Sequence, residues 1–161
     1  MYAQVAIKPN PLLRNGAYGI VMRGVQKCTR GCSSLRGRNK LPLCCIKLDT
    51  ATDPACGAGA LLIAFANECR RKSINYQTSV LFVAQDIDFL AGCMCYIQLS
   101  LMGCAGYVVI DDSIKNPALC YDKNGLIPKD ESNVWYTPMY FRDIWELRGL
   151  FAQQNLMTKE Y

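Results

Sequence analysis

The chain has 161 residues, of which 51% are hydrophobic, and its 18 basic and 13 acidic residues give a net charge of +5. This apolar content is sufficient for one folded domain with a single core and excludes a disordered tail. No apolar run reaches the roughly 18 residues of a membrane span, and residues 1–11 lack the order of a secretory signal, so we expect a cytoplasmic protein without a membrane partner.

The first 48 residues form a basic segment whose structure the sequence does not specify. They contain nine Lys and Arg and no acidic residue, whereas residues 49–161 contain nine basic and thirteen acidic residues. Six of the basic residues lie among Gly, Ser and Asn, which favours an arm that contacts DNA phosphates: Arg23, Lys27, Arg30, Arg36, Arg38 and Lys40. The last four of these are the candidate DNA contacts. A solvated loop without a partner and an acid-poor targeting arm are the alternative interpretations.

Ten cysteines suggest a metal site or disulfides, but their spacing favours neither. The sequence contains no Cys-x-x-Cys and no His. Cys93 and Cys95 lie in an expected helix, and Cys44 and Cys45 are adjacent, so the side chains of each pair diverge. We therefore predict no metal site, and expect reduced cysteines that serve as small core residues.

Residues 49–114 alternate between strand and helix patterns, which predicts an α/β fold with a mostly parallel sheet and flanking helices. The expected elements are a strand before Asp53, a helix over about 58–72, a buried strand over 80–84, a polar turn over 85–88, a helix capped by Asp88 and ending at Gly103, and a strand over 107–110. Five apolar residues of the second helix recur at helical spacing: Leu90, Cys93, Met94, Ile97 and Leu101.

The region after residue 114 loses this rhythm. Residues 115–134 are rich in Pro, Asn, Asp and Lys and are expected to form a loop or lid. Residues 135–161 are expected to form an aromatic C-terminal helix with Thr137 as cap and Pro138 at its first position. The apolar stripe of this helix is Tyr140, Ile144, Leu147 and Phe151. Five aromatic residues are expected to cover the sheet, with stacking on unpaired bases as the alternative: Trp135, Tyr136, Tyr140, Phe141 and Trp145.

The candidate site begins with the sequence Asp53-Pro-Ala-Cys-Gly-Ala-Gly-Ala60, which lies where a strand turns into a helix. Open parallel sheets bind nucleotide-like ligands at such turns, and glycines let the ligand approach the backbone. A dinucleotide fingerprint requires a third Gly or Ala, and that position is Leu62. A structural turn without a ligand is the alternative.

Two further acidic residues follow the next two strands. Asp86 is placed to accept hydrogen bonds from the two hydroxyls of a ribose, and Asp112 from an exocyclic amino group of an adenine. The alternatives are a helix cap for Asp86 and a turn for Asp112. Because the carboxyl ends of parallel strands share one edge, the glycine turn and both acids are expected to line a single site.

These motifs resemble those of adenine-specific DNA methyltransferases, particularly the modification subunits of type I restriction systems and small relatives on bacterial mobile elements. Asp53 to Ala60 is similar to the first motif of that family, Gln85-Asp86-Ile87-Asp88 to the second and Asp112-Ser113-Ile114 to the third. The resemblance implies a truncated, Rossmann-like fold of the S-adenosylmethionine-dependent methyltransferases. It also implies that the cofactor S-adenosylmethionine contacts Asp53, Pro54, Ala55, Cys56, Gly57, Gly59, Asp86, Ile87 and Asp112.

The chain departs from that family where the methyl acceptor is bound. The family holds a flipped adenine with Asn or Asp, Pro, Pro and an aromatic residue, whereas the only Asn-Pro after Asp112 is Asn116-Pro117, which is followed by Ala and Leu and is interpreted as a turn. No residue is therefore assigned as catalytic. The expected partners are DNA and a specificity or methylase subunit, and the alternative function is a non-catalytic module that binds DNA or a protein.

Overall fold

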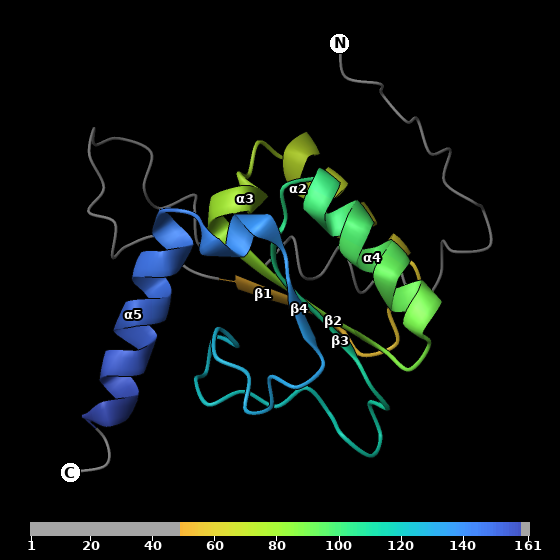
Figure 1. Ribbon diagram of the computed structural model, residues 1–161. Helices are drawn as coiled ribbons and strands as arrows, with labels where there is room; N and C mark the ends of the chain where they lie inside the picture. The colour runs from red at the N-terminus through yellow and green to blue at the C-terminus, as the bar shows by residue number, and fades with distance from the viewer. Residues whose placement is uncertain (1–48, 159–161) are drawn as a thin grey trace.

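The computed structural model describes residues 49–158 of the chain (Figure 1). The expectations for residues 1–48, including the DNA contacts of Arg30, Arg36, Arg38 and Lys40, lie outside the described residues. The described elements, in chain order, are β1 (Asp49–Asp53), α2 (Ala60–Arg71), α3 (Tyr76–Ser79), β2 (Val80–Asp86), α4 (Phe89–Leu101), β3 (Ala105–Ile110), β4 (Val134–Tyr136), the 3-10 helix η4 (Pro138–Phe141) and α5 (Ile144–Met157).

The strands form one four-stranded sheet in the order β1-β2-β3-β4. β1, β2 and β3 are parallel, and β4 is antiparallel to β3. β2 and β3 are almost entirely buried, which explains why both read as continuous apolar runs. The expected α/β fold with a mostly parallel sheet and flanking helices is confirmed.

Helices α2 and α4 cover one face of the sheet (Figure 1). Phe82 of β2 lies at the centre of this core, where its ring makes edge-to-face contacts with the rings of Phe65 and Tyr76. Leu99 of α4 and Cys104 are fully buried beside them. The six cysteines of the described part are free, and Cys56, Cys69, Cys95 and Cys104 are buried, as expected for small core residues.

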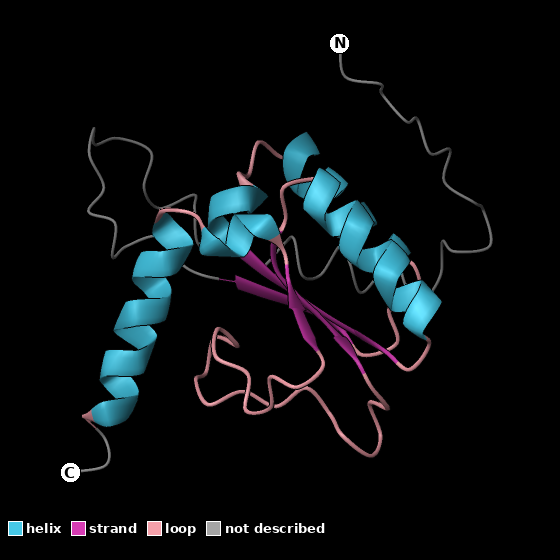
Figure 2. Cartoon of the chain, viewed as in Figure 1, coloured by secondary structure: helices cyan, strands magenta, loops and turns pink. Residues whose placement is uncertain are grey.

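The opposite face is covered by the long loop between β3 and β4 and by the start of α5 (Figure 2). Leu126 of the loop and Trp145 of α5 are each 2% exposed. The Trp145 indole N–H donates to the Gln77 carbonyl over 2.6 Å, and the Arg148 guanidinium lies 4.7 Å from the Trp145 ring centre. The buried Trp145 side chain therefore holds the start of α5 against α3, the short helix that leads into β2.

The boundaries of the expected core elements differ from the structure by two residues or fewer. The first helix begins at Ala60 rather than at 58, and the second strand extends through Gln85 to Asp86 instead of stopping at Ala84. Asp88 caps α4 as predicted, because its carboxylate accepts the Ala91 N–H over 2.7 Å. The third strand begins at Ala105.

Two expectations for the C-terminal region were wrong. Residues 134–136 form the strand β4, which was assigned to a loop and the start of a helix. The single helix expected after Thr137 is divided into η4 and α5, and Asp143 between them has a positive φ of 36°. Leu147 and Phe151 of the expected stripe are exposed, because α5 extends past the sheet (Figure 1) and buries only Trp145.

Thr137 is the N-cap residue of η4, with Pro138 at its first position as expected, but its side chain makes no capping hydrogen bond and instead joins the segment after β4 to β3. Thr137 is fully buried, and its hydroxyl donates to the Cys104 carbonyl over 2.7 Å and accepts the Gly106 N–H over 3.1 Å. The Thr137 N–H also donates to the Gly106 carbonyl. Among residues 49–158, no helix is long and apolar enough to cross a membrane.

Gly106→Ala is expected to destabilise the protein strongly. A Cβ at Gly106 would lie 1.8 Å from the Phe82 carbonyl oxygen on the neighbouring strand, which only movement of the backbone relieves. We expect a loss of about 3 kcal/mol or more in the free energy of unfolding, measured by urea denaturation.

Gly149→Ala is the matched control, because a Cβ there meets no atom within 4 Å and the residue lies inside α5. It should raise stability by about 0.5–1 kcal/mol through helix propensity. Equal effects of the two substitutions would contradict the close approach of β2 and β3 at Gly106.

Candidate functional site

The turn between β1 and α2 has the left-handed backbone that its glycines permit. Gly57 and Gly59 have φ values of 52° and 87°. The Cys56 N–H donates to the Gln85 carbonyl over 2.9 Å, and the Gly59 N–H donates to the Cys56 carbonyl over 2.8 Å. These bonds attach the turn to the end of β2 and close it immediately before α2 begins at Ala60.

The Asp86 carboxylate holds this turn from the next strand. One of its oxygens accepts the Gly57 N–H over 2.7 Å, and the other accepts the Asp88 N–H over 3.0 Å. Each carboxylate oxygen has two acceptor positions, so both oxygens retain capacity for a ligand hydroxyl. Asp86 thus serves the turn itself, and its remaining acceptor positions suit the ribose role expected from the sequence.

The other two acids hold local turns. Asp53 accepts the Ala55 N–H over 3.2 Å. Asp112 accepts the Ile114 N–H over 2.9 Å and lies 3.6 Å from the Lys115 ammonium. Within the described part of the chain, every contact of the Asp112 side chain is therefore one of a local turn, which is the alternative role given for this residue.

The three acids lie along one sloping edge of the sheet. Asp53 of β1 pairs with Ala84, and Asp86 of β2 pairs with Ile110, so each acid lies two residues beyond the preceding one. With about 3.3 Å per residue along a strand and about 4.8 Å between strands, the Cα atoms of Asp53 and Asp86 are roughly 8 Å apart. The structure brings Asp53, Asp86 and the glycine turn together and places Asp112 at the far end of this edge.

The surface beside the glycine turn is open. Pro54 and Ala55 are exposed, Ile87 is 71% exposed, and a Cβ built on Gly57 meets no atom within 4 Å. Ligand atoms therefore have room to approach the Gly57 backbone. Ile87 provides an apolar surface directly after Asp86.

Cys56 and Gly59 face the interior instead. Cys56 is buried, and its pKa is raised because its thiol hydrogen-bonds to Cys95 of α4 and because it is buried. A Cβ on Gly59 would lie 2.8 Å from the Cys95 sulfur. Gly59 is thus required for packing against α4, and the side chain of Cys56 is directed at that helix and not at the open surface.

Gln85 is a buried polar residue that the sequence analysis missed as a site residue. Its amide nitrogen donates to the carbonyls of Asn116 and Asp111 over 2.8 and 3.3 Å, and its amide oxygen accepts the Ala118 N–H over 3.0 Å. The signal in the sequence is one amide at the end of an otherwise apolar strand. Gln85 fixes the start of the long loop against the end of β2.

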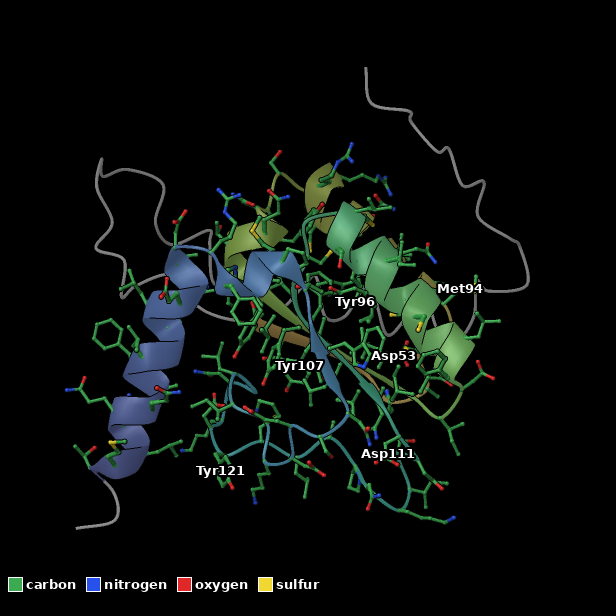
Figure 3. All side chains as sticks on the ribbon, in the orientation of Figure 1. Asp53, Met94, Tyr96, Tyr107, Asp111 and Tyr121 are labelled. Atoms are coloured by element: carbon green, nitrogen blue, oxygen red, sulfur yellow. The ribbon has the colours of Figure 1, made fainter. Side chains whose placement is uncertain are left out.

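A cavity of about 250 Å³ lies at the end of β3, beneath the long loop. Its lining includes Asp111, Lys115, Asn116, Lys129 and Asp130, and includes neither the glycine turn nor Asp86. Figure 3 shows Asp53 and Asp111 at the ends of β1 and β3, from which these two regions begin. No group of three His, Cys, Asp or Glu within residues 49–158 is arranged to hold a metal ion.

The chain matches none of the protein-family models, none of the curated proteins and none of the solved structures with which it was compared. A function for this site is therefore proposed from its geometry alone. That geometry is a left-handed glycine turn, a carboxylate that fixes it, and an open surface beside both.

Gln85→Met is expected to lower the free energy of unfolding by about 2–3 kcal/mol, because it leaves buried backbone groups of the loop without partners. Methionine has a similar length and makes none of the three hydrogen bonds of Gln85. Chemical denaturation measures the effect. Gln153→Met on the exposed side of α5 is the control and should change stability by less than about 0.5 kcal/mol.

Proposed function

We propose that the chain binds S-adenosylmethionine at the edge formed by β1, β2 and β3 and derives from adenine-specific DNA methyltransferases. The observation that carries this proposal is the hydrogen bond from the Gly57 N–H to the Asp86 carboxylate. It holds a left-handed turn beside open space, with a charged acceptor at the end of the adjacent strand. Parallel sheets bind nucleotide-like ligands at this position.

The residues of the edge fit the chemical groups of this cofactor. The free acceptor positions of Asp86 suit two ribose hydroxyls, and the exposed Ile87 side chain suits the face of an adenine ring. The backbone at Gly57 suits close approach of the methionine portion, and Asp53 suits its ammonium group. When bound, the cofactor supplies an electrophilic methyl group carried on a sulfonium.

The contacts of Asp112 are all local. Its carboxylate accepts backbone N–H groups of the following turn and lies near Lys115. To reach the exocyclic amino group of an adenine, Asp112 would use acceptor capacity beyond these bonds. We therefore rank Asp86 and Ile87 ahead of Asp112 as cofactor contacts.

The proposal assigns no base-binding residue within this chain. Asn116 lies in the bend after β3, where its side-chain amide donates to Asp111 over 3.3 Å and its carbonyl accepts from Gln85. These contacts are those of a turn. The residues that follow Asn116-Pro117 are Ala118 and Leu119, neither of which is an aromatic residue that could stack on an extruded base. In this proposal a specificity or methylase subunit completes the enzyme and provides the contacts to the DNA adenine.

Ile87→Ala is expected to weaken binding of S-adenosylmethionine without changing the stability of the fold. Ile87 is largely exposed, so its removal affects no core contact. The loss of one apolar contact of about 1 kcal/mol corresponds to roughly a five-fold rise in Kd, measured by isothermal titration of the full chain. The melting temperature should equal that of the unmodified chain.

Two further substitutions accompany this experiment, one as a control and one as a second test of the site. Leu150→Ala removes an exposed apolar side chain on α5 and should leave the Kd unchanged. Asp86→Asn should raise the Kd by about 10-fold or more, because the side chain loses its charge and its amide nitrogen can accept neither a backbone N–H of the site nor a ribose hydroxyl. Absence of binding heat from a folded, unmodified chain at high cofactor concentration would contradict the proposal.

The chain alone is expected not to methylate DNA, because its sequence contains no Asn- or Asp-Pro-Pro-aromatic motif to hold a flipped adenine. Incubation with tritium-labelled S-adenosylmethionine and DNA should leave the DNA unlabelled, while the same preparation binds the cofactor in titration. N6-methyladenine in the recovered DNA would show that a base pocket exists within this chain and would contradict the need for a partner subunit.

A further inference from the structure

Helix α4 is apolar on all sides but buried on only one. Its sequence, Phe-Leu-Ala-Gly-Cys-Met-Cys-Tyr-Ile-Gln-Leu-Ser-Leu, contains no charged residue. Only Gly92, Cys95 and Leu99 are buried against the sheet. Soluble helices of this kind normally carry polar residues on the side away from the core, and a helix that is hydrophobic all round is normally buried.

The outer side of α4 carries a continuous apolar stripe. Its four members are all exposed: Leu90 by 68%, Met94 by 48%, Ile97 by 54% and Leu101 by 83%. The expected helical spacing of these residues is thus confirmed, but they face away from the core instead of toward it. Met94 is labelled on this helix in Figure 3. An exposed apolar patch of this size marks an interaction surface.

The stripe is symmetric about its own centre. The successive intervals are four, three and four residues, the spacing of a coiled-coil seam. The midpoint between Leu90 and Leu101 is also the midpoint between Met94 and Ile97. A two-fold axis through this point brings the stripe onto an antiparallel copy of itself, as a closed dimer interface requires.

The charge distribution favours a second copy of the chain, rather than the basic segment of the same chain, as the partner that covers the stripe. Residues 1–48 contain nine basic and no acidic residues, and α4 offers no acid along its length to pair with them. An uncharged stripe meets its own copy without repulsion or desolvation of charge. An interfacial membrane helix would instead require Lys or Arg on its polar side.

The stripe has an aromatic flank that adds to its exposed apolar surface. Phe89 is 62% exposed next to the stripe and packs edge-to-face on Trp135 of β4, which also contacts Tyr96. Together the stripe and this flank expose apolar surface on the order of several hundred Å², which approaches the roughly 800 Å² that each partner buries in a standard interface. The flank widens the stripe on one side and is itself supported by the sheet.

We propose that two copies of the chain associate through α4, antiparallel and about a two-fold axis. Met94 of one copy packs on Ile97 of the other, and Leu90 packs on Leu101 at both ends. The antiparallel arrangement also places the positive end of each helix dipole beside the negative end of the other. This interface is independent of the proposed cofactor binding.

Sedimentation velocity of the full chain in reducing buffer tests the association. The unmodified chain should shift from monomer to dimer with rising concentration. Met94→Glu and Ile97→Lys should each raise the dimer Kd by about 30-fold or more, because each places two charges at the centre of an apolar interface. Leu150→Glu, on the exposed side of α5, is the control and should dimerise like the unmodified chain.

A mixture of the Met94→Glu and Ile97→Lys variants tests the register. In the proposed geometry the carboxylate introduced in one copy meets the ammonium introduced in the other, and the second contact stays Met94 on Ile97. The mixture should therefore dimerise although neither variant does alone, and this recovery also shows that both variants are folded. A chain that stays monomeric at every concentration overturns the proposal, as does a mixture that fails to associate. A monomer whose stripe is covered by residues 1–48 gives the first of these results.

Discussion

The carboxyl end of β2 is the constraint on which the rest of the site depends. The Asp86 carboxylate fixes the Gly57 turn and the start of α4, and the Gln85 carbonyl anchors the same turn. The Gln85 amide fixes the loop that leaves β3. Two adjacent residues on the central part of the sheet therefore set the positions of three chain segments that are distant in sequence. Their hydrogen bonds are effective because Gln85 is buried, where an unpaired amide is costly.

Helix α4 contributes to both proposed sites: its inner side and its cap contact the cofactor edge, and its outer side forms the dimer interface. Its inner side carries Gly92 and Cys95, which allow close packing on β3 and on the glycine turn. Its cap, Asp88, donates its N–H to Asp86 and thus belongs to the turn that the cofactor would contact. Its outer side carries the apolar stripe. The stripe begins at Leu90, three residues after Ile87, so the two proposed sites are neighbours along the chain.

Three of the five aromatic residues expected to cover the sheet pack against it, whereas Phe141 is 62% exposed and Trp135 is 39% exposed. Trp145 is buried, and Tyr136 and Tyr140 are half-buried beside Tyr107 of β3. The Tyr140 hydroxyl donates to the Leu126 carbonyl and so holds the long loop on the sheet. Trp135 lies on the other face, against α4. The short strand β4 divides this cluster between the two faces, because successive residues of a strand point to opposite sides.

The sequence alone determined the α/β pattern, the Asp88 cap and the glycine turn, because each depends on local periodicity or on side chains only a few residues apart. It also predicted that β2 is buried, since β2 is a short, continuous apolar run. Only the tertiary structure decided the role of Gln85, the pairing of β4 with β3, the interruption at Asp143 and the exposure of the α4 stripe. Helical spacing indicates which residues share a face of a helix, but whether that face meets the core depends on how the helix is rotated against the sheet. In α4 the side with Gly92, Cys95 and Leu99 meets the sheet, so the stripe on the opposite side points outward.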